Sequence, residues 1–428
     1  MINPEMQPFG IRSIVYDLRV VMRYRQLLVL CFAVFVSMIG FGLIMPFLPI
    51  YARDFGANKT QIGLMVSIFA MAKIFSAPVG GKAADLYGRK PVMLAGMCLY
   101  VVVMFLFGTA RTVNELMIYR AGQGAASGLV WPVAMAYIGD IVRDEDRGKA
   151  MGMYSVSFAS GNATGPILGG VIVSYFSLSV PFFFTSALAA VSAIMLYRGI
   201  DESFAGTREM SGAGEKRGHP FSFLKFKLHR ITPYPRTFLG LTVGSFTVFF
   251  GLAMVWPMLS LFGDEVLQLS RLQIAGIFTL MGIMQMIFMF PSGSLSDRTG
   301  RKRLIVIGCI LSSVFAGIIG RSTGYIFVLG AVAFYTLGRS MAEPSFTAFV
   351  SSLTPTRHRG KGMGTYNFAQ NLAFATGSFL SGIIADLAGL RTPFLVALIM
   401  GLLGVVLITV MVHEPDRAEL AERIRNLV

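Results

Sequence analysis

The chain has 428 residues, of which 54% are hydrophobic and 14% are charged, and its formal net charge at pH 7 is +15. Soluble globular domains carry roughly 25% charged residues, so this composition excludes an ordinary soluble protein and indicates an integral membrane protein. The positive residues are spread over many short polar segments and form no single patch, which excludes a nucleic-acid-binding role.

Residues 1–26 form the first predicted element. They carry four arginines, and hydrophobic residues recur at helical spacing on one side. Basic amphipathic segments of this kind lie on anionic membrane surfaces. We therefore expect residues 1–26 to form a cytoplasmic amphipathic segment that precedes the first membrane span.

Twelve apolar runs follow, each long enough for the ~20 residues that cross a bilayer as a helix; we number them spans 1 to 12. The first six lie at roughly 27–51, 61–80, 91–109, 114–140, 148–175 and 179–198. The second six lie at roughly 238–263, 271–293, 303–321, 325–353, 360–388 and 391–412. The sequence therefore predicts an all-α membrane protein with twelve transmembrane helices in two six-helix bundles. The predicted boundaries are 27–198 for the N-terminal bundle, 199–237 for a cytoplasmic linker, 238–412 for the C-terminal bundle and 413–428 for a cytoplasmic tail.

The two sets of spans are copies of one another. The stretch GKAADLYGRKP at 81–91 recurs as GSLSDRTGRKR at 293–303, at an offset of 212 residues. The same offset relates Arg147-Gly148-Lys149 to Arg359-Gly360-Lys361, Tyr154 to Tyr366, and Pro132 to Pro344. An offset shared over so much of the chain indicates an internal duplication, so the two bundles are expected to be pseudosymmetric.

Basic residues predict the orientation in the membrane. Most Lys and Arg residues fall in the termini and in the connections on the same side as the termini, and few fall in the opposite connections. By the positive-inside rule, both termini are expected to be cytoplasmic. We expect the membrane to be a bacterial inner membrane or one derived from it.

The duplicated loops, between spans 2 and 3 and between spans 8 and 9, combine glycines for a tight turn, a basic pair and one aspartate that requires a partner. A carboxylate near a helix N-terminus contributes on the order of 0.3–1 kcal/mol. We predict that Asp85 contacts the start of span 11 and Asp297 the start of span 5, which latches the cytoplasmic side when the outer side is open. The predicted latch residues are Gly81, Asp85, Gly88, Arg89, Lys90, Gly293, Asp297, Gly300, Arg301 and Lys302.

Span 5 has small residues at four-residue spacing. Gly161, Gly165 and Gly169 form a stripe that permits close contact with another helix, and Pro166 removes one intrahelical hydrogen bond. We predict that this stripe packs against span 8 of the other half and forms a hinge between the halves. The predicted hinge residues are Gly152, Gly161, Gly165, Pro166, Gly169 and Gly170.

Charged residues inside spans cost at least ~2.5–3.5 kcal/mol each on insertion scales, and they mark functional sites or wet cavities. Glu343 is the only acidic residue well inside a span, and Arg339 lies one helical turn before it. A carboxylate whose proton affinity changes as Arg339 engages or leaves it is a candidate proton-coupling site; a static pair that only fixes span 10 is the alternative. The predicted cavity residues are Arg120, Gln123, Arg339, Glu343, Tyr366, Asn367, Gln370, Asn371 and Gln285.

These motifs resemble those of the major facilitator superfamily. The loops at 81–90 and 293–302 are similar to its signature, G-x-x-x-D-x-x-G-R-K/R. The family's second motif is similar to Leu116, Arg120, Gln123 and Gly124 in span 4. The glycines and proline of span 5 resemble the motif of the twelve-span drug:proton antiporter branch.

The resemblance implies a secondary transporter with the major facilitator fold, in which two bundles rock around a central site by alternating access. It implies export of a small lipophilic or amphiphilic solute against proton entry, with the lipid bilayer, protons and a small-molecule or ion substrate as partners. We expect a monomer. The chain departs from several multidrug members in having no acidic residue in span 1, so proton coupling through span 1 is excluded.

Two alternatives remain open. In length and general character the chain is also similar to superfamily members of the bacterial magnetosome membrane, which would imply iron or another metal ion as cargo. One buried carboxylate, however, is a poor cage for a divalent metal. A non-transporting membrane sensor or assembly protein is the second alternative. Its mark would be loss of the latch or of the intramembrane charges, and all of these are present: Asp85, Asp297, Arg120 and Glu343.

Reactive side chains are few and scattered. The three cysteines stand singly in apolar runs, and the four histidines fall in polar segments. Neither a disulfide framework nor a thiolate metal site is indicated, and the question of a bound metal stays open. The apolar runs contain no nucleotide-binding loop and no Ser, His and Asp arrangement, so we predict neither an enzyme nor a cofactor.

Overall fold

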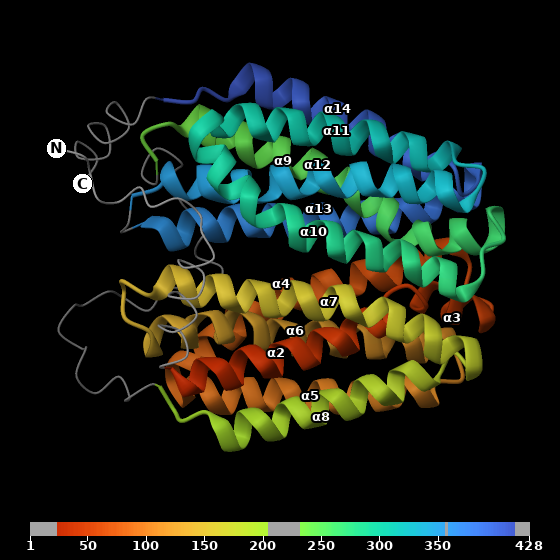
Figure 1. Ribbon diagram of the computed structural model, residues 1–428, viewed down its shortest axis with the longest axis horizontal. Helices are drawn as coiled ribbons and strands as arrows, with labels where there is room; N and C mark the ends of the chain where they lie inside the picture. Colours follow the sequence, from red (N-terminus) through yellow and green to blue (C-terminus); the bar gives the residue numbers. More distant parts are fainter. Residues whose placement is uncertain (1–23, 204–231, 356–357, 416–428) are drawn as a thin grey trace.

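The computed structural model describes residues 24–203, 232–355 and 358–415. Most of the predicted segment 1–26, linker 199–237 and tail 413–428 lies outside these ranges, so those boundaries stay predictions. Within the described ranges every regular element is a helix. Figure 1 shows the helices as two bundles side by side, all running along the long axis of the molecule.

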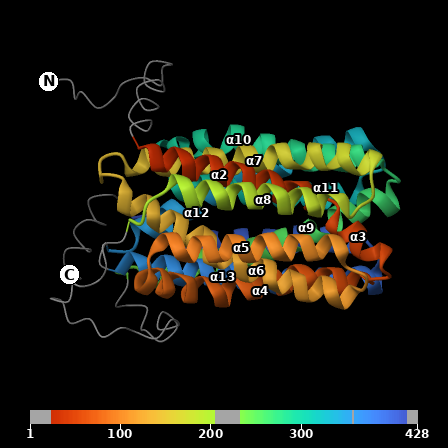
Figure 2. The same ribbon diagram turned by 90° about the horizontal axis from the view of Figure 1, so that it is seen from below.

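Each bundle is formed by consecutive helices. The N-terminal bundle contains α2 (Arg25–Ile44), α3 (Leu48–Asp54), α4 (Lys59–Tyr87), α5 (Arg89–Thr109), α6 (Val113–Ile141), α7 (Arg147–Tyr175) and α8 (Val180–Gly199). The C-terminal bundle contains α9 (Pro235–Leu261) with its π-helical extension η3 (Phe262–Val266), α10 (Arg271–Thr299), α11 (Arg301–Arg321), α12 (Tyr325–Ser352), α13 (Arg359–Ala388) and α14 (Thr392–Met411). We name the end at which α2 begins and α14 ends the terminal face, and the opposite end, where α3 lies, the far face (Figures 1 and 2).

Span 1 differs from its prediction as one continuous helix at 27–51. α2 ends at Ile44, and α3 begins at Leu48. Pro46 lacks the backbone N–H that would continue the helix, and the N–H of Phe47 instead donates to the carbonyl of Ile44, only three residues back, at 3.1 Å. The apolar run is therefore divided into a long and a short helix.

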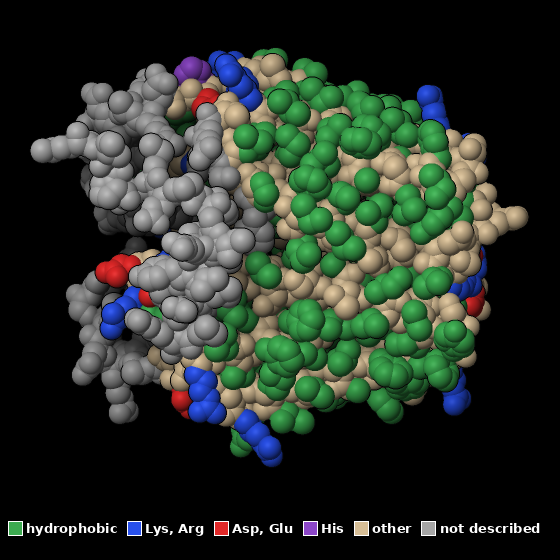
Figure 3. All heavy atoms as spheres, viewed as in Figure 1, with side chains coloured by type: hydrophobic (Ala, Val, Ile, Leu, Met, Phe, Trp, Pro, Cys, Tyr) green, Lys and Arg blue, Asp and Glu red, His purple; other side chains and the backbone are tan. Residues whose placement is uncertain are grey.

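Eleven of the described helices are long and apolar enough to cross a membrane. The predicted span that is not among them is α6, which has 29 residues but includes the polar Glu115, Arg120 and Asp140. A helix of 29 residues is ~43 Å long, which exceeds the ~30 Å hydrocarbon core, and α6 packs against α4 and α5. Figure 3 shows apolar side chains over the middle of the visible surface and charged side chains toward its two ends.

The small-residue stripe lies on α7 and packs within its own half. Gly161, Gly165 and Gly169 lie against carbonyl oxygens of α2, and a Cβ added at Gly165 would lie 2.5 Å from one of them. The predicted partner, span 8, was therefore wrong for these three glycines. Gly170 does contact span 8, where it packs against Ala275 of α10. Small-residue spacing predicts a close helix contact but does not identify the helix that makes it.

A glutamate that follows the last helix of the N-terminal half caps α5. Glu202 accepts hydrogen bonds from the backbone N–H groups of Arg89 (2.8 Å) and Lys90 (3.0 Å). The Lys90 side chain donates back to the carbonyl of Ile200 (2.6 Å). Gly88, which joins α4 to α5, has a φ of +102°, a conformation that side-chain-bearing residues rarely adopt. The carboxylate satisfies N–H groups that have no partner inside the helix and complements its dipole.

The C-terminal half repeats this arrangement. Glu414 accepts hydrogen bonds from the N–H groups of Arg301 (2.7 Å) and Lys302 (3.1 Å), and Lys302 donates to the carbonyl of Val412 (2.6 Å). Gly300 has a φ of +96°. We call these two arrangements the glutamate clamps. Their members have the same offset of 212 residues as the loop motifs, so the repeat contained a signal for them that the motif analysis did not use.

The two halves meet along α4 with α13 and along α7 with α10. Toward the far face the contacts are close: Gly63 of α4 lies against the carbonyl oxygen of Ser378 on α13, and Gly170 of α7 lies against Ala275 of α10. Toward the terminal face, each of the four helices has a glycine beside open space. Among the described residues, no atom would lie within 4 Å of a Cβ added at these positions, which are Gly81, Gly152, Gly293 and Gly364. Among the described residues, the halves are therefore in contact at the far face and apart at the terminal face.

Polar contacts also join the halves at the far face, and we name this group the far-face clasp. Asp386 of α13 accepts hydrogen bonds from the N–H (2.8 Å) and the hydroxyl (2.6 Å) of Thr60, at the start of α4. Arg53 of α3 is ion-paired with Asp264 of η3 (2.5 Å), which also pairs with Arg271 of α10 (2.7 Å). Burial lowers the pKa of the Arg53 guanidinium, but bonding to Asp264 and the neighbouring carboxylate outweighs burial and raises the pKa above its ordinary value.

The Asp386→Asn variant should loosen the far face. The amide keeps the size of the carboxylate but carries no charge, which weakens the bonds from Thr60. The reporter is a Ser378→Cys substitution in a background without the three native cysteines, because Ser378 is 0% exposed. We expect a water-soluble maleimide to label this cysteine several-fold faster in the Asp386→Asn variant than in the parent. Asp54→Asn, which changes a carboxylate near Arg53 within the same half, is the control. Equal labelling rates in both variants and the parent would contradict a role for the clasp.

Removing either glutamate clamp should lower stability by about the same amount. Glu202→Ala and Glu414→Ala each leave two helix N–H groups without their carboxylate, at a cost of ~1 kcal/mol. We expect the thermal unfolding midpoint of each variant to fall by a few degrees. Glu145→Ala, at an exposed position, should leave the midpoint unchanged, and a similar fall in this control would argue against the clamps.

Candidate functional site

A cavity of about 400 Å³ lies between the two halves. On one side it is lined by α2, α4, α6 and α7, and on the other by α9, α10, α12 and α13. Pockets for small organic ligands have volumes of roughly 300–1,000 Å³, so this cavity suits such a ligand. The contacts between the halves close it toward the far face.

Most of the cavity wall is apolar and aromatic. The aromatic lining residues are Phe41, Phe69, Phe158, Phe249, Trp256, Phe278 and Phe374. Met45 and Met281 add flexible side chains that adapt to ligands of different shape. These surfaces favour a ligand with a substantial apolar body.

The residues predicted for the cavity divide into two groups. Six of them line it: Arg120, Gln285, Arg339, Glu343, Gln370 and Asn371. Gln123 lies behind Arg120, to which it is hydrogen bonded, and Tyr366 is fully buried and accepts a hydrogen bond from Gln370 (2.6 Å). Asn367 accepts a bond from Asn371 through its backbone carbonyl (2.7 Å). These last three residues support the wall from behind and do not line the cavity.

Arg339 and Glu343 form an ion pair along α12. The Arg339 guanidinium lies 3.0 Å from the Glu343 carboxylate, and the two side chains are 20% and 35% exposed. Glu343 is the one acidic side chain among the described residues that line the cavity. The pair therefore places a carboxylate and a guanidinium together on the cavity wall.

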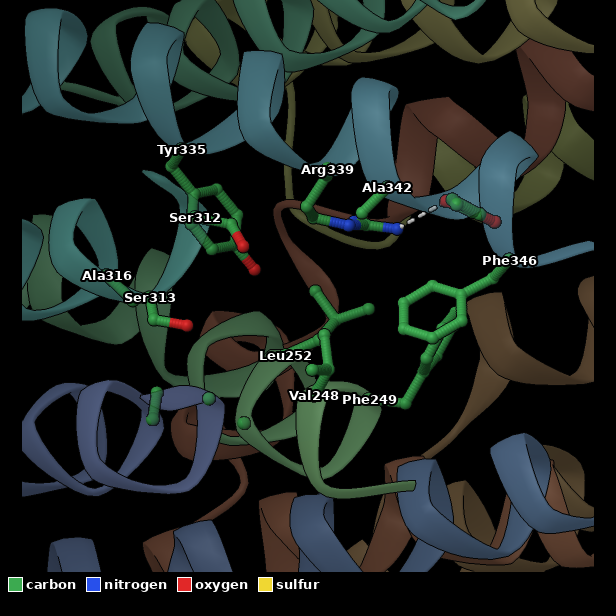
Figure 4. Close-up of a pocket in the computed structure, with 14 residues that line it drawn as sticks. Val248, Phe249, Leu252, Ser312, Ser313, Ala316, Tyr335, Arg339, Ala342 and Phe346 are labelled. Carbon is green, nitrogen blue, oxygen red and sulfur yellow. Dashed lines mark hydrogen bonds and ion pairs between the residues drawn. The ribbon is translucent and has the colours of Figure 1, made fainter. Parts of the chain in front are cut away.

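A second, smaller pocket of about 30 Å³ lies inside the C-terminal half, between α9, α11, α12 and α14. It shares Arg339 with the central cavity, and its wall also includes the partner carboxylate of the ion pair. Figure 4 shows the hydroxyl-bearing Tyr335, Ser312 and Ser313 to one side of Arg339 and an aromatic ring, that of Phe346, to the other. A water molecule needs ~10–15 Å³ and polar partners. The ion pair therefore separates the central cavity from a chamber that fits a water molecule.

The wall contributed by the N-terminal half has a different character. Arg120 is 1% exposed, donates to Gln123 and lies over the ring of Phe69 at 4.6 Å. Its Nε has no hydrogen-bond partner among the described residues. Lys73 of α4 also lines the cavity. Our site prediction omitted Lys73, although a lysine inside an apolar run is the same kind of signal that identified Arg120.

The duplicated loops lie at the terminal face. Asp85 is ion-paired with Arg89 of its own loop (2.6 Å), and Arg89 also pairs with Asp140 at the end of α6 (3.1 Å). The side chain of Asp297 lies outside the described residues. Among the described residues the halves are apart here, so the predicted contacts with the starts of spans 11 and 5 stay predictions.

Comparison with known proteins assigns the chain to a family. A family model described as the Major Facilitator Superfamily matches residues 30–242 and 241–426. Multidrug resistance protein 2 of Bacillus subtilis (strain 168) is 28% identical over 366 residues, which cover 85% of this chain and 89% of that protein. Quinolone resistance protein NorA of Staphylococcus aureus is 26% identical over 402 residues, which cover 93% of this chain and 99% of that protein.

Solved structures confirm the predicted all-α membrane fold. A mutant of the nucleoside transporter NupG matches with a TM-score of 0.76 at 14% identity, over 90% of this chain and 99% of that chain. The comparisons do not show the resemblance to transporters of the magnetosome membrane. They do confirm that the protein is a transporter and not an enzyme. The chain belongs to the Major Facilitator Superfamily and is a multi-pass integral membrane secondary transporter.

Proposed function

We propose that this transporter exports small lipophilic or amphiphilic solutes in exchange for protons, as a monomer. The observation that carries the proposal is the Arg339–Glu343 ion pair on the wall of an aromatic cavity between the halves. The names of its relatives, a multidrug resistance protein and a quinolone resistance protein, support it. A titratable carboxylate beside an apolar binding surface is the chemistry that links proton binding to solute binding.

The terminal face is cytoplasmic in this proposal, because the basic residues concentrate in the termini and in the connections on their side. The contact of the halves at the far face and their separation at the terminal face then correspond to a state open to the cytoplasm. A solute enters the cavity from the cytoplasm and leaves through the far face after the halves have rocked.

Glu343 is the proposed coupling residue. In its ionised form it attracts Arg339 across 3.0 Å, and a bound proton removes that attraction. The small pocket behind the pair has room for a water molecule, which in this proposal lies next to the carboxylate and outside the space that the solute occupies. Arg339 is thereby held or released according to the protonation of Glu343.

Rocking requires one set of contacts to break and another to form. The far-face clasp must open, since Asp386 and Thr60 lie in opposite halves. At the terminal face, Asp85 is exposed and directed to its neighbour Arg89, and it becomes available to the start of α13 when that face closes. The clasp and the latch therefore stabilise opposite states.

Iron or another metal ion is the competing cargo. Among the residues that the structure describes, no group of three or more His, Cys, Asp or Glu side chains could hold a metal ion. No observation favours metal over an organic solute, so ferrous iron serves as a test cargo. A sensor without transport would move none of the test cargoes.

Glu343→Gln should abolish proton coupling and preserve solute exchange. Glutamine resembles the protonated carboxyl group and cannot release a proton. We expect solute-driven proton movement, read from a pH dye inside proteoliposomes, to fall to the level of protein-free vesicles. Exchange of labelled for unlabelled solute should continue, which shows that the variant is folded.

The matched control is Glu145→Gln, at an exposed loop position, which should couple like the parent. Proton movement at the parent rate in Glu343→Gln would rule out this carboxylate as the coupling site. Proton movement with ferrous iron alone would replace the organic cargo by a metal.

Asp85→Asn should slow transport by impairing closure of the terminal face. Its neutral amide interacts more weakly with a helix N-terminus than a carboxylate does, by up to ~1 kcal/mol, so we expect a several-fold lower initial rate in the same vesicles. Solute affinity should not change, because Asp85 does not line the cavity. A lower affinity with an unchanged rate would contradict the latch.

A further inference from the structure

The central cavity has an excess of positive charge. Its wall contains three cationic side chains, Lys73, Arg120 and Arg339, and a single carboxylate, Glu343. Arg339 is paired with that carboxylate at 3.0 Å. The two cations without an acidic partner, Lys73 and Arg120, are both on the wall contributed by the N-terminal half.

Arg120 is held in place with bonding capacity to spare. It extends from α6, and Gln123 and the face of Phe69 fix its guanidinium. The side chain is almost wholly buried, yet its Nε has no partner among the described residues. A guanidinium stays protonated in proteins, so this group brings a permanent positive charge to the cavity wall, with a buried N–H that has no partner among the described residues.

Lys73 supplies the second positive charge. It lies one helical turn after Phe69 on α4, the residue over which Arg120 lies, and all three side chains line the cavity. The described residues offer no hydrogen bond or ion pair to its amine. The equivalent position in the other half, 212 residues later, is the neutral Gln285, so the repeated framework does not require a lysine here.

Unpaired cations in a membrane protein are costly unless a counter-charge or water compensates them. Two of them lie on one wall, and the one lining carboxylate, Glu343, lies on the other wall and is paired with Arg339. Such a wall suits a negative group, and the lining residues Phe41, Phe158 and Trp256 suit an apolar body. Relying on the proposed export function, we propose that the cargo is an amphiphilic organic acid whose carboxylate, sulfonate or phosphate group binds between Lys73 and Arg120.

The test measures binding with probes that share one apolar body and differ in charge. The chain has two tryptophans, and the Trp131→Phe substitution leaves only Trp256, which lines the cavity. Energy transfer from Trp256 to a bound dansyl group then reports binding. The probes are N-dansylglycine, its uncharged amide, and N-dansylethylenediamine, which carries a positive charge at pH 7. We expect the acid to bind at least about tenfold more tightly than the amide, because a tenfold difference in affinity corresponds to the free energy of one hydrogen bond to a charged group. The amine should bind most weakly.

Lys73→Gln should erase this preference and leave the affinity for the amide unchanged. Lys82→Gln is the matched control, because Lys82 lies on the same helix at an exposed position and should retain the preference. Equal affinity for the three probes, or the tightest binding of the amine, would overturn the proposal. So would an acid preference that survives Lys73→Gln.

The same probes in proteoliposomes separate this proposal from the export function. Acid-selective binding that depends on Lys73, together with proton movement, supports both. Proton movement driven best by the amine overturns the acid site and leaves proton-coupled export intact. Acid-selective binding without any proton movement supports the site and overturns the coupled export.

Discussion

A charged side chain inside a membrane bundle must meet an opposite charge or water, because an isolated ion there costs several kcal/mol. Arg339 and Glu343 meet this requirement along one helix, but Lys73 and the Nε of Arg120 have no partner in the described part of the chain. They depend on the space between the halves. That space exists because, among the described residues, the halves touch mainly along α4 with α13 and α7 with α10 and part toward the terminal face.

The duplication repeats the framework and leaves the cavity walls different. Both glutamate clamps have the same members at the same offset, so each half closes its own helix ends in the same way. The cavity charges do not repeat: the counterpart of Lys73 is Gln285, and the counterpart of Glu343 is Trp131. Rocking needs two similar rigid bodies, whereas binding and coupling need distinct chemistry on the two walls. The N-terminal wall is cationic, and the C-terminal wall carries the one lining carboxylate, Glu343.

The length of the apolar runs and the repeat offset predicted most of the fold, since a span needs ~20 apolar residues and a duplication sets the two halves in register. The partner of a helix was not predictable in this way, because any backbone can pack on the small-residue stripe of α7, and that of α2 does. The far-face clasp depends on how the halves dock, which leaves no local pattern. Within the site, charge inside a span identified Arg120 and Glu343 and applies equally to Lys73, whereas polarity alone placed Tyr366 in a cavity that it does not line.

The charges on the two walls are the basis of both proposals. Lys73 and Arg120 lie on the wall of the N-terminal half, and Glu343 lies on the wall of the C-terminal half. The charge of a bound acid would be compensated on its own wall by these two cations, whereas Glu343 keeps its partner Arg339 on the other wall. Exchange then requires that cargo and proton occupy the cavity in turn, so that the halves change state with one or the other bound.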